Sequence, residues 1–227
     1  MSTIISTYSH HGWEDYYRNH VSERAWNGHP DEFLMEHIED LILRDTRSIL
    51  DVGAGDGRNL EPFLNRGFSA VATDLSPTAL STLGRRCQED WLQKPLLICG
   101  DFLSVQFLPS QFDVIICFNA ISHFEEPMEC LAKMISLLRP CGRLIFNAFT
   151  PNDVAYGQGE NVGDHKFYYR DTLFTFMTAD HILSVLPDSV DVVRSETRRW
   201  QEPDHGEYRR GVHTHEACFF ILKKRST

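Results

Sequence analysis

One segment determines how this chain is built: Ser48-Ile49-Leu50-Asp51-Val52-Gly53-Ala54-Gly55-Asp56-Gly57-Arg58-Asn59. It begins as a short, bounded apolar run of the kind that a buried parallel strand makes. Glycines at alternate positions follow, and a helical pattern resumes over residues 59–64. Glycines permit tight backbone angles and let a ligand lie against the main chain, while the first turn of a helix offers unpaired amides. The segment therefore predicts a strand, a glycine turn and a helix that together bind a nucleotide.

The acid at the end of the expected strand, Asp51, separates this segment from the usual dinucleotide-binding turn. That turn reads Gly-x-Gly-x-x-Gly, and its third glycine lets the helix pack close beneath a pyrophosphate. Here the pattern is acid-x-Gly-x-Gly-x-Gly. A carboxylate at this place would repel a pyrophosphate but suits an amino group. The pattern disfavours a nicotinamide dehydrogenase, and it resembles the first motif of the class I S-adenosylmethionine-dependent methyltransferases.

Two further expected strands also end in acids. Residues 69–77 read as a strand that ends in an acid, Asp74. Asp74 follows Asp51 at close to the roughly 20-residue offset expected of a ribose-binding carboxylate. The strand over residues 95–102 ends at Asp101, followed by Phe102. In the resembled family the acid at this position receives the adenine amino group, and the next backbone amide meets the ring. Acids ending three successive strands would be an odd coincidence in a purely structural sheet.

The resemblance continues through the fourth and fifth expected strands. Residues 111–119 resemble the family's fourth motif, which emerges beside the methyl group. Residues 127–138 have helical periodicity, and residues 139–143 read as a turn before a strand over 144–149. The run Leu137-Leu138-Arg139-Pro140-Cys141-Gly142 before that strand is also familiar in this family. The likeness therefore covers residues 48–149.

The resemblance implies an α/β fold with a Rossmann-like, doubly wound, seven-stranded sheet in the order 3-2-1-4-5-7-6, whose last strand is antiparallel. Residues 190–200 and 216–222 are the strands expected to form its antiparallel pair. We expect a single domain, residues 1–227, in four parts. Residues 1–47 form an N-terminal helical cap, 48–149 the cofactor-binding core, 150–170 an irregular substrate lid, and 171–227 a C-terminal helix with the strand pair.

The implied cofactor is S-adenosyl-L-methionine, with S-adenosyl-L-homocysteine as product. Carried over position by position, with aromatic residues of the cap added, the resemblance gives these cofactor-binding residues: Tyr17, Trp26, Asp51, Gly53, Gly55, Arg58, Asp74, Leu75, Asp101, Phe102 and Asn119. His123 follows the fourth strand and is the preferred general base, with Asn119 as a second catalytic candidate. A base matters less for a thiol, part of which is already ionised, than for a hydroxyl or amine.

Substrate-side candidates lie beyond the fifth strand: His165, Tyr168, Tyr169, Arg170 and His215. On a strand, His213 and His215 would share one face, and Asp204 or His205 could complete a metal site with them. The spacing matches no closed zinc site, so no metal is expected, and a contact at the rim of the substrate pocket or a solvated hairpin is preferred. The Trp26-Asn27-Gly28-His29-Pro30 run of the cap resembles thiopurine- and tellurite-type methyltransferases. This resemblance slightly favours sulfur or another soft nucleophile as the methyl acceptor.

The composition of the chain disfavours some classes of binding partner and some cellular compartments. A net charge of −10 disfavours a protein that grips nucleic acid, and no apolar run approaches the roughly 18 residues that cross a membrane. The N-terminus carries no signal-peptide pattern, and the scattered cysteines read as buried, reduced thiols. We therefore expect a cytoplasmic protein acting on a small molecule, with monomer or homodimer undetermined. A module that binds the cofactor without catalysis is the alternative.

Overall fold

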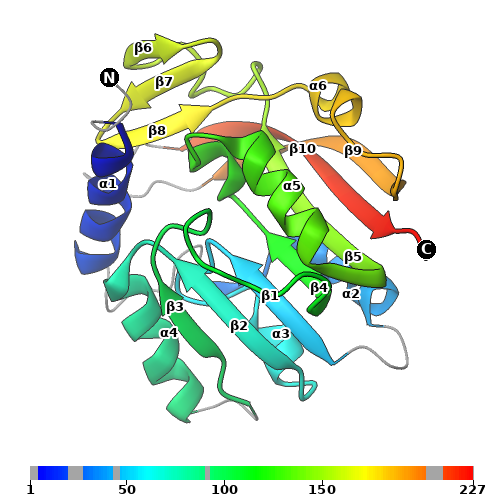
Figure 1. Cartoon of the computed structure of the whole chain (residues 1–227). Helices are drawn as coiled ribbons and strands as arrows, with labels where there is room; N and C mark the ends of the chain where they lie inside the picture. Colours follow the sequence, from blue (N-terminus) through cyan, green and yellow to red (C-terminus); the bar gives the residue numbers. More distant parts are fainter. Residues whose placement is uncertain (1–4, 20–27, 43–46, 90–92, 203–211, 227) are drawn as a thin grey trace.

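A computed structural model describes residues 5–19, 28–42, 47–89, 93–202 and 212–226. Its main sheet has seven strands in the order β3-β2-β1-β4-β5-β10-β9, which confirms the predicted order (Figure 1). β1 is parallel to β2 and β4, whereas β10 is antiparallel to both β5 and β9. The strands are β1 Ser48–Val52, β2 Ser69–Asp74, β3 Leu96–Cys99, β4 Phe112–Cys117, β5 Leu138–Phe149, β9 Val190–Glu202 and β10 His213–Lys224.

Helices cover both faces of this sheet, because its strands are apolar on both sides. Ile49 and Phe219 face one hydrophobic cluster, while their neighbours Leu50 and Phe220 face the other. The first cluster is shared with α2 Glu32–Leu41, α3 Glu61–Leu64 and α4 Pro77–Glu89, and the second with α5 Pro127–Leu137 and α6 Ala179–Ser184. The result is a three-layer sandwich whose strand ends are left open for a ligand.

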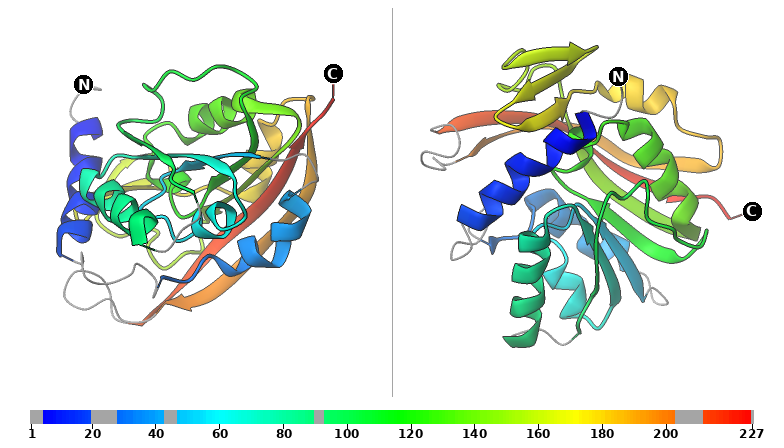
Figure 2. Two further views of the ribbon diagram at one scale, coloured as in Figure 1. Left: turned by 90° about the horizontal axis from the view of Figure 1, so that it is seen from below. Right: turned by 60° about the vertical axis from the view of Figure 1, so that its left-hand side comes forward.

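The N-terminal helix α1, Ile5–Asn19, crosses the edge of the main sheet instead of packing on a face (Figure 2). The middle of this helix contacts a small second sheet, where the amide of Gly12 donates to the carbonyl of Asp171 at 3.1 Å. Further along, Glu14 accepts hydrogen bonds from Ser76 Oγ and Thr78 Oγ1, each at 2.6 Å, at the start of α4. Hydrogen bonds therefore hold α1 both to the small sheet and to the start of α4.

The first half of the segment expected to be an irregular lid, residues 150–159, is irregular, but its second half contributes two strands of a three-stranded antiparallel sheet. β6 Glu160–Gly163, β7 Lys166–Tyr169 and β8 Thr172–Thr175 pair in that order. Each strand has only four residues. A run that short cannot show a clear alternation of apolar and polar residues, so the sequence pattern missed the strands.

Two smaller expectations were wrong. Residues 139–143 are not a free turn but part of β5, with Cys141 at φ 64° and an irregular register opposite β4. Cys99 is exposed, since β3 is an edge strand. Nowhere in the described part of the chain is a helix both long and apolar enough to cross a membrane.

Candidate cofactor and active site

A cleft of about 880 Å³, including its open mouth, lies beyond the carboxyl ends of β1, β2 and β4. This is where the strand order changes direction, from β2 on one side of β1 to β4 on the other. Open parallel sheets bind ligands at such a switch point. Three groups of residues line the cleft: the glycine loop after β1, the acidic Asp74, and the aromatic side chains of Trp13 and Tyr17 on α1.

The glycine loop forms a floor that only glycine can make. Gly53 and Gly55 have φ values of 71° and 55°, in the left-handed region that other residues avoid. A Cβ on Gly53 would lie 2.3 Å from the Cβ of Ala120, and one on Gly55 would lie 2.2 Å from Tyr17 Oη. Both glycines line the cleft. A ligand can therefore rest directly against main-chain atoms.

Asp74 forms the acidic wall and holds the loop in shape. Its Oδ2 accepts from the amide of Gly55 and its Oδ1 from the amide of Ser76, both at 2.8 Å. Burial raises the pKa of Asp74, and these amides partly offset that effect. A carboxylate has about four acceptor sites, so it retains capacity for the two hydroxyls of a vicinal diol. The expected ribose-binding role fits this geometry.

Asp51 lies beneath the loop rather than in the cleft lining. It is 2% exposed, and its Oδ2 has no hydrogen-bond partner among the described residues. Burial, and next the charge of Asp74, raise the pKa of Asp51 well above its usual range. A buried, unsatisfied carboxyl is costly unless a cation or donor meets it. An ammonium group at this place, such as that of a bound amino acid, would relieve both effects.

Asn119 projects into the cleft from the end of β4. Its backbone lies at φ 53°, a conformation that asparagine tolerates better than most residues. The amide of Asn119 donates to Asn147 Oδ1, and Asn147 Nδ2 donates to Asn119 Oδ1, both at 2.7 Å. Asn147, buried on β5, therefore fixes both the backbone and the side chain of the predicted residue.

His123 lies in the one-turn helix η2, Ile121–His123, and lines the cleft. Its Nδ1 is 2.7 Å from the carbonyl oxygen of Leu173 on β8. A carbonyl only accepts, so the proton must be on Nδ1 and the lone pair of the neutral ring on Nε2. The rings of Trp13 and Phe174 pack edge-on against the imidazole at 5.0 and 4.8 Å. The small sheet thus fixes the tautomer that a general base requires.

The cap closes the cleft with aromatic side chains. Trp13 and Tyr17, one turn apart on α1, both line it. Burial, and next the charge of Asp74, raise the pKa of the Tyr17 hydroxyl well above its usual range, so this group is a neutral hydrogen-bonding partner. Arg58 also lines the cleft, and its Nη1 donates to the carbonyl of His29 at 2.9 Å.

Most predicted cofactor residues meet in this cleft: Tyr17, Gly53, Gly55, Arg58, Asp74, Leu75, Phe102 and Asn119, together with the predicted base His123. Asp101 is not in the lining, and its carboxylate accepts from the amide of Leu103 and from Ser104 Oγ instead. Its expected adenine contact stays a prediction. Trp26 lies outside the described residues.

The predicted substrate residues do not line the cleft. His165 is exposed, and its Nδ1 pairs with Tyr156 Oη at 2.8 Å. Tyr168, Tyr169 and Arg170 belong to β7 and the turn after it, where Arg170 lies over the ring of Tyr169. Their role towards a substrate stays a prediction.

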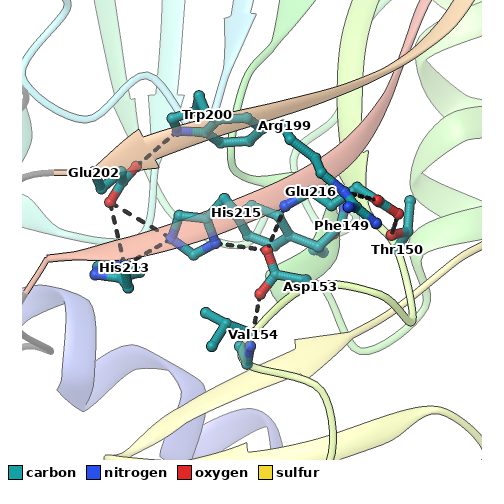
Figure 3. A network of polar contacts seen from close by, with 12 residues as sticks. Phe149, Thr150, Asp153, Val154, Arg199, Trp200, Glu202, His213, His215 and Glu216 are labelled. Carbon is teal, nitrogen blue, oxygen red and sulfur yellow. Dashed lines mark hydrogen bonds and ion pairs between the residues drawn. The ribbon is translucent and has the colours of Figure 1, made fainter.

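His215 lies deeper than expected. It is buried, and its ring stacks on Phe149 at 5.0 Å (Figure 3). Phe149 in turn contacts His123. Burial lowers its pKa, but Asp153 and Glu202 outweigh that effect and raise the pKa of His215 to about 9. Asp204 and His205, its suggested metal-site companions, lie outside the described residues.

Sequence reasoning missed several contributors to the cleft. Trp13 could have been found, because it stands four residues before Tyr17 and so on the same helix face. Phe124, which also lines the cleft, directly follows the predicted base. Glu14 and Asn147 gave no such signal, because their roles depend on which elements meet in the fold.

Comparisons with known proteins agree with this geometry. A family model for a methyltransferase domain matches residues 50–146. The ubiquinone biosynthesis O-methyltransferase of Schizosaccharomyces pombe, a mitochondrial protein, is 27% identical over 158 residues, covering 69% of this chain and 52% of that protein. The ubiquinone biosynthesis O-methyltransferase of Coxiella burnetii is 24% identical over 173 residues, covering 74% of this chain and 67% of that protein. The chain thus spans about half the length of the first relative and about two thirds of the second.

Solved structures share the fold. An S-adenosylmethionine-dependent methyltransferase from Methanosarcina mazei superposes with a TM-score of 0.67 at 16% identity, covering 84% of this chain and 97% of that one. Magnesium protoporphyrin IX methyltransferase from Synechocystis, solved with bound S-adenosylmethionine, gives a TM-score of 0.56 at 15% identity, covering 100% and 86%. The chain therefore contains a methyltransferase domain over residues 50–146 and shares the fold of solved S-adenosylmethionine-dependent methyltransferases. Its cofactor is S-adenosylmethionine, which the unsatisfied Asp51, the glycine floor and Asp74 fit.

Proposed function

We propose that this protein methylates a hydroxyl oxygen of a small aromatic molecule, with His123 as the general base. The observation that carries the proposal is the hydrogen bond from His123 Nδ1 to the carbonyl of Leu173 within the wall of the cofactor cleft. A phenolic hydroxyl is mostly protonated at neutral pH, so it gains from a base held in the accepting tautomer.

The cofactor would be held by the residues already described. Asp74 would bind the ribose diol, the main chain at Gly53 and Gly55 would support the ligand, and Asp51 would stabilise the ammonium group. S-adenosylmethionine supplies an electrophilic methyl group on a sulfonium, which needs no metal for its transfer. The protein's part is to position the acceptor, remove its proton and keep water out.

An aromatic acceptor is favoured by the rings around His123. Trp13 and Phe124 line the cleft beside it, and Phe149 and Phe174 contact the imidazole from behind. Flat apolar walls of this kind bind a ring by offset or edge contacts. The two relatives are O-methyltransferases by name, which supports oxygen over the soft nucleophile that the cap sequence favoured. The net charge of −10 supports a small molecule over nucleic acid.

The test compares a phenol series with matched thiols, using methyl-labelled cofactor. We expect phenols to be methylated, and His123→Gln to lower kcat for phenols by about 10²- to 10⁴-fold. The loss should be much smaller for thiols, which ionise more readily. Affinity for S-adenosylhomocysteine should be unchanged, which checks folding.

Two outcomes would contradict the proposal. Equal losses for phenols and thiols would mean that His123 positions the acceptor without taking its proton. Binding of the cofactor with no methyl transfer to any phenol, thiol or amine would favour a non-catalytic binding module.

A further inference from the structure

The antiparallel pair of β9 and β10 brings three metal-ligating side chains together outside the cofactor cleft. Glu202 is the register partner of His213, and His215 lies two residues further along β10 on the same face (Figure 3). The Nε2 atoms of the two histidines are 3.0 Å apart. Glu202 Oε2 is 3.6 Å from His213 Nε2 and 3.5 Å from His215 Nε2. The three atoms therefore form a nearly equilateral triangle.

That triangle has the dimensions of one face of a metal coordination sphere. A tetrahedral ion with ligand bonds of about 2.0–2.1 Å separates its ligand atoms by about 3.3 Å. The observed edges, from 3.0 to 3.6 Å, bracket this value. The side chains are only 5–9% exposed, so this is not a chance cluster of solvated groups.

A second layer of contacts fixes the ligand atoms in place. Asp153 Oδ2 accepts from His215 Nδ1 at 2.6 Å and from the amide of Glu216 at 2.9 Å. Because Nδ1 keeps its proton for Asp153, Nε2, the atom inside the triangle, is the nitrogen that would give up its proton to an ion on binding. Trp200 Nε1 donates to Glu202 Oε1 at 3.3 Å, which leaves Oε2 nearest the histidines. Carboxylates that orient ligating histidines in this way are usual around protein metal sites.

We propose that Glu202, His213 and His215 bind a divalent transition-metal ion, of which Zn²⁺ is the representative probe. Two imidazoles and one carboxylate suit Zn²⁺ and its first-row neighbours, whereas Mg²⁺ and Ca²⁺ take oxygen ligands. Three protein ligands leave a coordination position for water or another ligand. Sequence spacing alone disfavoured a metal, because the third ligand comes from the neighbouring strand and only the register between β9 and β10 identifies it.

The competing explanation is a hydrogen-bonded cluster without an ion. In that case His213 Nε2 donates its proton to His215 Nε2, and Glu202 accepts from the pair. Both explanations use the same atoms, but only one of them predicts stoichiometric metal binding.

The first experiment is calorimetric titration of untagged, chelator-treated protein with Zn²⁺. We expect one equivalent to bind. His213→Gln and Glu202→Gln, which keep the side-chain size close to the original, should each weaken binding at least about tenfold. His181→Gln, at an exposed histidine on α6, is the matched control and should bind as the wild type does. S-adenosylhomocysteine affinity is measured on every variant and should not change.

A second readout needs no variant. Co²⁺ bound at this site should give the visible absorption of a four- or five-coordinate ion without a thiolate charge-transfer band, because no cysteine belongs to the cluster. Absence of stoichiometric binding by the wild type would overturn the proposal. So would a thiolate band, or variants that bind Zn²⁺ as tightly as the control.

Discussion

Asp74 does two tasks with one carboxylate, and this makes it the most informative single residue. Its oxygens shape the glycine loop through the amide of Gly55 and anchor the turn through the amide of Ser76. The same oxygens face the cleft where a diol would bind. Because a hydrogen bond to a charged group contributes about 1.5–3 kcal/mol, removing the charge should be felt directly in cofactor affinity.

We expect Asp74→Asn to weaken binding of S-adenosylhomocysteine by about 10- to 100-fold, measured by calorimetry. The asparagine keeps one acceptor oxygen but cannot take two hydroxyls and an amide at once. Asp164→Asn, at an exposed position in the turn between β6 and β7, is the control and should leave affinity unchanged. Equal affinity of the Asp74 variant and the wild type would mean that the ribose lies elsewhere.

Single residues also show which positions near the cleft the sequence could and could not point to. Asp51, Asp74, Asn119 and His123 could be predicted because each directly ends or follows an expected strand, and parallel strands place their carboxyl ends at one edge. Asn147 could not be predicted in the same way. Its importance comes from a reciprocal contact with Asn119 across neighbouring strands.

At the scale of elements, α1 depends on a partly exposed carboxylate, Glu14, that contacts the start of α4. Burial raises the pKa of Glu14, but hydrogen bonds from Ser76 and Thr78 and the charge of Arg18 outweigh it, and the pKa lies below its usual value of 4.5. The contribution of Glu14 to folding is therefore complete above that usual value. It is lost as the pH falls through the lower pKa of the folded protein.

Glu14→Gln should lower the free energy of unfolding at pH 7 by about 1–2 kcal/mol, because the amide is a weaker acceptor and donates where acceptance is needed. The difference between variant and wild type should shrink as the pH falls below 4.5. Denaturant titrations at several pH values measure both effects. Asp15→Asn, the exposed neighbour, serves as control, and a difference that is independent of pH would contradict the account.

The contact between α1 and β8 depends on the absence of a side chain at Gly12. A Cβ there would lie 2.2 Å from Thr172 Oγ1 and 2.6 Å from the carbonyl oxygen of Asp171. The backbone oxygen cannot turn away, so Gly12→Ala should destabilise the protein by about 1–3 kcal/mol and weaken S-adenosylhomocysteine binding. In an unconstrained helix the same change would stabilise by about 0.5–1 kcal/mol. A rise in melting temperature would therefore show that α1 does not pack closely on β8.

For the whole molecule, the order of the main sheet could be predicted because the motifs within residues 48–149 resemble those of a known family, and the observed order is the one that this resemblance implies. The small sheet lies outside the resembled residues, and its four-residue strands carry too little periodicity to be predicted on their own. The sequence could predict only part of the cluster of His213, His215 and Glu202. Two of its members share a strand face by spacing, but the third depends on the register between β9 and β10.

The cleft at the end of β1, β2 and β4 has the lining that S-adenosylmethionine requires. Calorimetric titration of the full chain with S-adenosylmethionine and, separately, with S-adenosylhomocysteine tests it most directly. We expect one site for each ligand with near-micromolar affinity, and weaker binding of both by the Asp74→Asn variant. Failure of the wild-type protein to bind either ligand would contradict it.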